Sequence, residues 1–230
     1  HEIIPIQGCA IQDIKSIQIA KYVVDAIKKF NLSVYDEKTG EGLMRHVVVK
    51  AAKSLEEYMV ILVVNANELP HAKEIARSLV GACHSIVSVV VNVNMKNTNV
   101  ILGDKNITVY GRDYITDRLG DYFFKISPLS FYQVNPVQAE ALYNYAIEAA
   151  EITKDDIVFD LYCGIGTISI FMANSAKEVY GVEIVEQAIE MAKENNTTLS
   201  LLVRKRIFDY DNWFKGINTI KEIEKLEKGE

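Results

Sequence analysis

The feature that most constrains the fold is the run Val158–Thr167, in which an apolar strand pattern leads through a Gly-X-Gly turn into a helical pattern. Gly164 and Gly166 lack a Cβ, so the backbone can pass close to a ligand there. Glu183 ends the next strand-like run, where a carboxylate can accept hydrogen bonds from the ribose hydroxyls of an adenosine. Such strand–turn–helix units indicate a doubly wound sheet of parallel strands.

The same turn favours S-adenosylmethionine over a dinucleotide. The third glycine of the dinucleotide fingerprint lets a helix approach the pyrophosphate, and Ser169 occupies that position here. A sulfonium nucleoside needs no such approach. The alternative is a turn whose glycines serve only packing, and the presence of Asp160 before the turn and Glu183 after it makes that interpretation less favoured.

The pattern of predicted elements changes near residue 127. The pattern in residues 1–126 is typical of an α+β domain with antiparallel strands, and residues 127–230 alternate strand and helix as a partial, Rossmann-like domain does. In the first part we expect helices at 11–30 and 71–81 and strands at 43–51, 58–65, 86–93, 100–102, 107–110 and 122–126. In the second part we expect helices at 135–150, 167–174 and 185–195 and strands at 157–161 and 178–183.

Composition narrows the class of protein further. The chain has 230 residues and a net charge of −6, which argues against a nucleic-acid binder. The alternative is a local basic face formed by Lys50 and Lys53, or by Arg112, Arg118 and Lys125. No apolar run reaches the length of a membrane span, so we expect no membrane partner. Three cysteines cannot make a disulfide framework, which favours a reducing cytoplasm. The chain starts at His1 without a methionine, so we expect a partial start.

Four separate motifs make the chain similar to a known family. The turn resembles the first motif of the RNA uracil-C5 methyltransferases, and the segment before it resembles the lead-in to their methyltransferase fold. Two upstream runs are similar to the central domain of the same family. In order along the chain these motifs are GLMRHVVV at 42–49, NTNVI at 97–101, ISPLSFYQVN at 126–135 and DLYCGIGT at 160–167. The resemblance covers roughly residues 5–197, and it implies S-adenosylmethionine as methyl donor and RNA as partner.

Residue by residue, the resemblance implies a donor pocket lined by Gln133, Tyr162, Thr167 and Glu183, beside the two glycines. Gln133 offers a donor and an acceptor to the methionine end of the ligand. Tyr162 can lay its aromatic face near a cationic sulfonium. Thr167 stands where the family often has Asn, and its hydroxyl offers fewer donors. The alternatives are a surface role for Gln133 and an ordinary core role for Tyr162.

The cysteines have separate interpretations. Cys9 resembles the last of four cysteines that hold an iron–sulfur cluster in many family members. The other three would precede residue 1, so we expect the cluster in a full-length parent and not in this chain; a plain buried thiol is an equal alternative. Cys163 lies in the glycine turn, and we expect it not to act as a nucleophile. Cys83 is expected in the core.

We expect no catalytic residue within this chain. The resemblance implies a nucleophilic cysteine farther along, in a Ser-Cys-Asn-Pro-like segment, and the sequence has no cysteine after Cys163. From about residue 197 the resemblance fades; a third strand at 201–208 and a charged helix at 213–228 are expected there. The favoured function is methylation of uridine C5 in RNA, with ribosomal RNA ahead of transfer RNA. The alternative is a non-catalytic module that binds S-adenosylmethionine or RNA.

Overall fold

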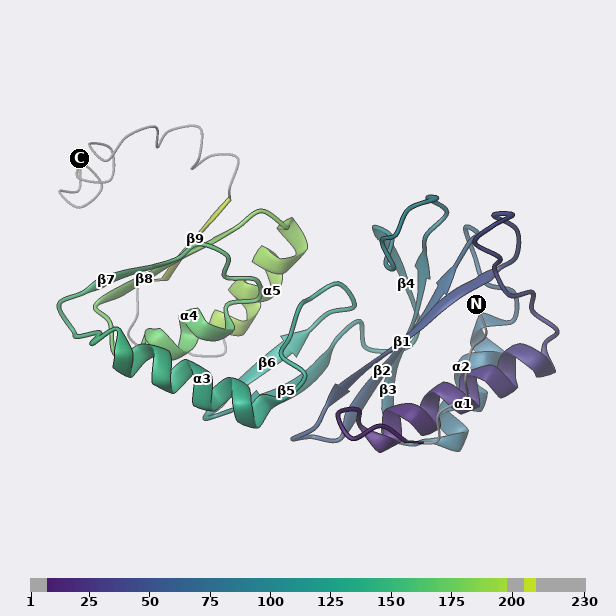
Figure 1. Cartoon of the computed structure of the whole chain (residues 1–230), viewed down its shortest axis with the longest axis horizontal. Coiled ribbons are helices and arrows are strands. Elements are labelled where there is room, and N and C mark those ends of the chain that lie inside the picture. Colours follow the sequence, from purple (N-terminus) through teal and green to yellow (C-terminus); the bar gives the residue numbers. More distant parts are fainter. Residues whose placement is uncertain (1–7, 198–204, 210–230) are drawn as a thin grey trace. The chain divides into compact units, whose positions relative to one another are not determined.

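A computed structural model describes residues 8–197 and 205–209, and the chain divides into two units, His1–Arg118 and Leu119–Glu230 (Figure 1). The division falls eight residues before the end of the expected first domain, in the strand that precedes β6. A functional domain boundary near residue 127 stays a prediction, because compactness alone does not define a domain.

The first unit contains a four-stranded sheet in the order β1-β2-β3-β4. The antiparallel pairs are β1 (Met44–Ala52) with β2 (Glu57–Val64) and β3 (Ile86–Val93) with β4 (Lys105–Gly111). The middle pair, β2 with β3, is parallel. The expectation of antiparallel strands is therefore right for the outer pairs and wrong for the middle one. The chain returns through helix α2 (Ala72–Ala82), and a helical crossover brings the next strand back in the same direction.

Helices α1 (Ile14–Lys29) and α2 cover one face of this sheet (Figure 1). Apolar residues at three-to-four spacing, among them Ile14, Ile17 and Val24, predict the buried face of α1. This is right only in part, because Ile14 and Val24 are exposed while Ile19 and Val23 are fully buried against the sheet. The segment has more apolar residues than one helical face can bury, so its periodicity allows more than one phase. The helix also begins later than expected.

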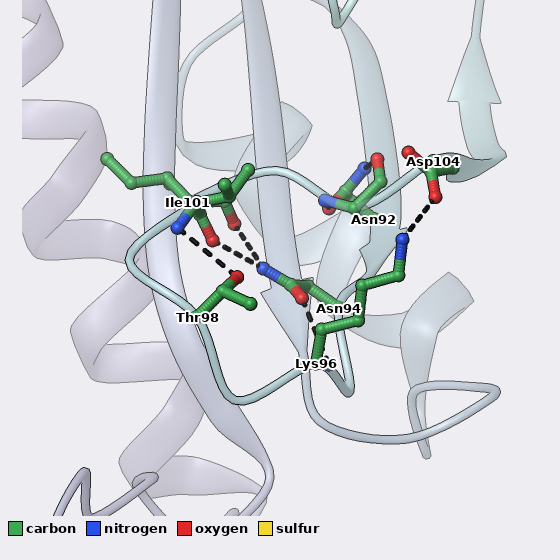
Figure 2. Close-up of polar contacts among 8 residues, drawn as sticks. Asn92, Asn94, Lys96, Thr98, Ile101 and Asp104 are labelled. Atoms are coloured by element: carbon green, nitrogen blue, oxygen red, sulfur yellow. Dashed lines mark hydrogen bonds and ion pairs between the residues drawn. The ribbon is translucent and has the colours of Figure 1, made fainter.

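The connection between β3 and β4 is an irregular loop, although a strand was expected at 100–102. Asn94 Nδ2 donates to the carbonyls of Val100 and Ile101 at 2.7 and 3.0 Å (Figure 2). The buried amide of Asn92 accepts from Gly103 N–H at 2.7 Å and donates to Gly103 O at 2.8 Å. Because side-chain amides satisfy the loop backbone, this apolar run does not need a strand partner.

Strand β5 (Ile115–Leu119), which pairs with β6 (Tyr122–Ile126), was missed from sequence because it carries Asp117 and Arg118. Asp117 is nonetheless buried, and its Oδ1 accepts hydrogen bonds from the backbone N–H and hydroxyl of Ser54. A buried charged residue breaks the alternation of apolar and polar residues by which a strand is predicted from sequence.

The second unit has a sheet of three parallel strands in the order β7-β8-β9. Helix α4 is shorter than expected. The strand expected at 201–208 is seen as β9 from residue 205, and residues 201–204 lie outside the described residues. The helix expected at 213–228 lies outside the described residues. The elements are α3 (Pro136–Ala149), β7 (Ile157–Asp160), α4 (Thr167–Met172), β8 (Glu178–Glu183), α5 (Glu186–Thr197) and β9 (Lys205–Asp209).

Aromatic and aliphatic side chains from α3, α4 and β6 form a core in this unit. Phe171 packs edge-on against Tyr143 and shares a cluster with Phe124, while Ala173 and Val179 belong to a second cluster. These contacts fix α4, and with it the turn that precedes α4. In the described part of the chain, no helix has both the length and the apolar character needed to cross a membrane.

Candidate functional site

The turn between β7 and α4 is held by hydrogen bonds from its own backbone. Cys163 N–H donates to the carbonyl of Val182 on β8 at 3.1 Å, and Gly166 N–H donates to the carbonyl of Cys163 at 2.8 Å. Ser169 Oγ donates to Asp160 Oδ2 at 2.6 Å, which joins the end of β7 to the start of α4. The turn therefore has a fixed shape before any ligand arrives.

The two glycines of the turn have different surroundings. Both adopt left-handed backbone angles, with φ of +54° at Gly164 and +82° at Gly166. A Cβ built on Gly166 would lie 3.5 Å from Cβ of Ala192 on α5, whereas a Cβ built on Gly164 would meet nothing within 4 Å. Gly166 thus serves backbone conformation and packing. Gly164 faces open space, where a ligand can approach the backbone.

Glu183, at the end of β8, lies directly beside this open position. Its Oε2 accepts from Gly164 N–H at 3.0 Å, and its Oε1 accepts from the N–H groups of Ile184 and Val185 at 2.8 and 2.9 Å. A carboxylate has about four lone-pair directions, and three are used here. To accept from two ribose hydroxyls, Glu183 would have to give up at least one of these backbone bonds.

The electrostatics of the turn favour a cationic ligand. Burial raises the pKa of the Asp160 carboxyl and the charge of Glu183 adds to this, while hydrogen bonds from Ser169 and from Tyr162 N–H oppose it. Asp160 and Glu183 end neighbouring strands, so two carboxyl groups lie at the same edge of the sheet beside the turn. A sulfonium would be attracted by this field, whereas a pyrophosphate would be repelled.

Cys163, inside the turn, has the wrong properties for a nucleophile. Burial first, and then the charges of Asp160 and Glu183, together raise the pKa of its thiol to about 12. The thiolate is the reactive form, so a buried thiol of this kind is inert near neutral pH.

The remaining candidates are less directly tied to the turn. Tyr162 is 89% exposed, so its ring is not a core side chain. The hydroxyl of Thr167 lies 3.1 Å from the hydroxyl of Tyr143 on α3. Gln133 is half-buried in the irregular segment between β6 and α3, and in the described part of the chain no hydrogen bond joins it to the turn. Its role in donor binding stays a prediction.

One residue that sequence reasoning missed touches the turn directly. Asn195 on α5 is buried, and its Nδ2 donates to the carbonyl of Ile165 at 3.2 Å. The available signal was a polar residue on the face of the helix that also carries the buried residues Ile189 and Ala192. That signal shows burial, but it does not identify the partner.

No metal site is seen in the described ranges, where no group of three or more His, Cys, Asp or Glu side chains could hold an ion. Cys9 is half-buried and is not part of a disulfide. Its assignment as a cluster ligand depends on cysteines that the sequence does not contain, and it stays a prediction.

Comparison with known proteins decides the family. The sequence model of the tRNA (Uracil-5-)-methyltransferase family matches residues 48–205, which is more than half of the chain. The chain belongs to this family. The match includes all the sequence that forms the turn, Glu183 and α5.

Two relatives that are named as RNA methyltransferases are close in sequence. An uncharacterized RNA methyltransferase of Clostridium tetani is 47% identical over 195 residues, covering 85% of this chain and 42% of the relative. One from Staphylococcus aureus strain MSSA476 is 44% identical over 197 residues, covering 86% of this chain and 44% of the relative. The chain thus spans less than half the length of these relatives.

A solved structure has a similar fold. The Pyrococcus abyssi tRNA (uracil-54, C5)-methyltransferase, crystallised with S-adenosyl-L-homocysteine, superposes with a TM-score of 0.73 at 26% identity. The similarity covers 90% of this chain and 50% of that one. The expected fold class is confirmed: a Rossmann-like fold of the S-adenosylmethionine-dependent methyltransferases preceded by a unit of mixed helices and strands.

Proposed function

We propose that this chain supplies the S-adenosylmethionine-binding part of an enzyme that methylates C5 of uridine in RNA. The observation that carries the proposal is the 3.0 Å hydrogen bond between Gly164 N–H and Glu183, which puts an acceptor for ribose hydroxyls beside the open side of the turn. When bound, S-adenosylmethionine supplies an electrophilic methyl group on a positively charged sulfur.

The chain's residues have the following proposed roles. Glu183 accepts from the ribose hydroxyls, and Gly164 leaves room for the ligand against the backbone. Tyr162, which is largely exposed, places an aromatic ring where a sulfonium can lie over it. Gln133 and Thr167 bind the polar end of the methionine portion, and Gly166 keeps the turn in its left-handed form.

The substrate and location are proposed at a finer level than family membership gives. The Pyrococcus abyssi relative is named for uracil-54 of tRNA, which makes transfer RNA a direct candidate. Ribosomal RNA is the candidate favoured from the sequence, so both RNAs belong in the assay. Three cysteines without a disulfide among them favour the cytoplasm.

A second candidate function is a binding module without chemistry. Two observations on the cysteines favour it. The sequence has no cysteine after Cys163, and the thiol of Cys163 is buried with a pKa raised to about 12. Addition to C6 of uracil requires a thiolate. We therefore propose that this polypeptide by itself binds the methyl donor without transferring the methyl group.

Two measurements test the proposal. Isothermal titration calorimetry with S-adenosylmethionine should give a saturable 1:1 isotherm. Incubation of the chain with methyl-tritiated S-adenosylmethionine and uridine-containing ribosomal or transfer RNA should transfer no label above a boiled-protein control. Absence of donor binding at millimolar ligand by folded protein would refute the donor-site assignment, and robust transfer would refute the account of the missing nucleophile.

A further inference from the structure

We propose that Asn195 is a positioning residue of the donor site, whose side-chain amide ties the glycine turn to the end of strand β6. Its Nδ2 donates to Ile165 O at 3.2 Å and to Lys125 O at 3.3 Å, while its Oδ1 accepts from Lys125 N–H at 2.7 Å. This inference rests on the proposed function, because it assigns a purpose to the turn that Asn195 holds.

The amide is matched to its partners in only one orientation. Lys125 presents one N–H and one carbonyl, as it would to a neighbouring strand, and the Asn195 amide fills the place of that strand. Rotating the amide by half a turn would bring its NH2 group against the N–H of Lys125 and its oxygen against two carbonyls. Both hydrogens of Nδ2 are used, one for each element, so the amide physically links β6 to the turn.

Burial makes these bonds matter. Asn195 is 1% exposed, so water cannot replace an amide that is removed. An unsatisfied buried carbonyl costs roughly 1–3 kcal/mol, and the turn would relax to avoid this cost. Ala192, one helical turn earlier, already lies against the Cβ position of Gly166. Helix α5 therefore holds the turn at two successive residues, Ile165 and Gly166.

The link connects two segments that the proposed function requires together. Strand β6 ends at Ile126, and the segment that follows carries Gln133, which is proposed to bind the methionine end of the donor. The turn carries Gly164, beside Glu183, which is proposed to bind the ribose end. Asn195 bonds both the turn, at Ile165, and the strand from which the Gln133 segment leaves, at Lys125, so it adds a direct polar link to the core packing that already joins β6 and α4.

The deciding experiment compares N195D with a matched control, N92D. Asn92 in the first unit is also fully buried, and its amide likewise bonds the N–H and the carbonyl of one residue, Gly103. Each variant keeps an acceptor oxygen and loses the NH2 donors. We expect N195D to weaken S-adenosylmethionine binding at least tenfold, measured by calorimetry per folded molecule, and N92D to leave the dissociation constant within twofold of the unmodified chain.

The possible outcomes separate the inference from the proposed function. If the unmodified chain binds the donor and folded N195D binds it within twofold as tightly, Asn195 is merely structural and the inference is wrong. If the unmodified chain does not bind the donor at all, the proposed function fails and the inference fails with it. Equal loss of affinity in N195D and N92D would show a general effect of destabilisation and would also overturn the inference.

A measurement on the unmodified chain covers the case in which N195D does not fold. Hydrogen exchange of the Lys125 amide, which bonds Asn195 Oδ1, should slow several-fold when S-adenosylmethionine binds, because the ligand stabilises the turn to which Asn195 is bonded. The Gly103 amide, which bonds Asn92 Oδ1, should exchange at an unchanged rate. Unchanged exchange at Lys125 in the donor-bound protein would contradict the link.

Discussion

Glu183 has two possible tasks at the scale of the single residue. Its carboxylate accepts three backbone hydrogen bonds, so it is already a structural group that orders the turn and the start of α5. The proposed ribose contact is a second use of the same oxygens. Structural and binding roles predict different responses to mutation, since the first changes stability and the second changes donor affinity.

We expect E183A to weaken S-adenosylmethionine binding at least tenfold, which corresponds to about 1.4 kcal/mol or more. The reason is the loss of both acceptors for the ribose hydroxyls. Calorimetry measures the affinity, and urea unfolding measures the structural loss separately. E186A is the control, because Glu186 is an exposed acidic residue in the first turn of α5. An unchanged affinity in folded E183A would exclude the ribose role.

Cys163 should resist alkylation in the folded protein. With a pKa raised to about 12, roughly one thiol in ten thousand is ionised at pH 8. We expect N-ethylmaleimide at pH 8 to label the half-buried Cys9 and Cys83 well before Cys163, as read by peptide mass spectrometry. The same reagent in 8 M urea (a solvent condition that removes burial) should label all three. Rapid labelling of Cys163 without urea would show a reactive thiol in the turn.

The turn and Glu183 could be predicted from sequence, and Asn195 and Ser169 could not. The turn and Glu183 are predicted by the spacing between elements. A glycine turn after one strand and an acidic residue at the end of the next strand meet at one edge of a parallel sheet. Asn195 and Ser169 act through hydrogen bonds to the carbonyl of Ile165 and the carboxylate of Asp160. Those partners become neighbours only after packing.

At the scale of the element, helix α1 shows how a single cap overrides a periodic pattern. Asp13 Oδ2 accepts from Ser16 N–H at 2.8 Å and also from Tyr58 OH at 3.1 Å. Burial alone would raise the pKa of Asp13, but the hydrogen bonds from Ser16 and Tyr58 outweigh it, so the pKa lies below its usual value. The cap fixes both where the helix starts and which face meets the sheet.

We expect D13A to lower the free energy of unfolding by about 1–2 kcal/mol, as for other lost caps. Since the pKa of Asp13 is depressed by folding, its stabilisation is present above the unfolded value of 3.8 and is lost as pH falls through the lower, folded value. Urea titrations at pH 7 and below pH 3 should therefore show a large difference between D13A and the unmodified chain at pH 7 and a smaller one in acid.

The control for that prediction is D25A, since Asp25 is exposed on the same helix. It should change the free energy of unfolding by less than about 0.5 kcal/mol at either pH. If D13A behaves like D25A at pH 7, the hydrogen bonds of Asp13 contribute no net stability.

Continuous apolar runs predicted strands well, and exceptions have physical causes. The run at 86–93 is buried on both faces and forms β3 with the expected limits. The short run at 100–102 is instead a loop, since Asn94 satisfies its carbonyls. Strand β5 escaped prediction because Asp117 is buried by tertiary hydrogen bonds to Ser54, which no local pattern contains.

At the scale of the whole molecule, sequence predicted the α/β class and the family but not every strand direction. Direction follows from the connection: a turn gives an antiparallel neighbour, and a helical crossover gives a parallel one. The helix at 71–81 was expected between two strands. Because residues 1–126 were expected to form an α+β domain with antiparallel strands, the parallel crossover unit formed by β2, α2 and β3 was not predicted.

Charge leads to a prediction about RNA. With a net charge of −6, this chain can neutralise few phosphates. We expect weak binding to a uridine-containing RNA and a plot of log affinity against log salt with a slope no steeper than about −3, since each neutralised phosphate contributes about −0.7 to −0.9. Fluorescence anisotropy between 50 and 300 mM KCl measures it. A slope near −6 would reveal a concentrated basic face and would favour the RNA-binding alternative.

The crossover between β2 and β3 also determines the order in which the first sheet can assemble. Strands β1 and β2 are joined by a short turn and can pair as soon as both have left the ribosome. Strand β3 cannot join until α2 has formed and turned back, and β4 must wait for β3. During this interval the backbone N–H and C=O groups along one edge of β2, whose side chains are apolar, have no strand partner. We therefore expect a newly made chain to be most prone to aggregate just before α2 docks.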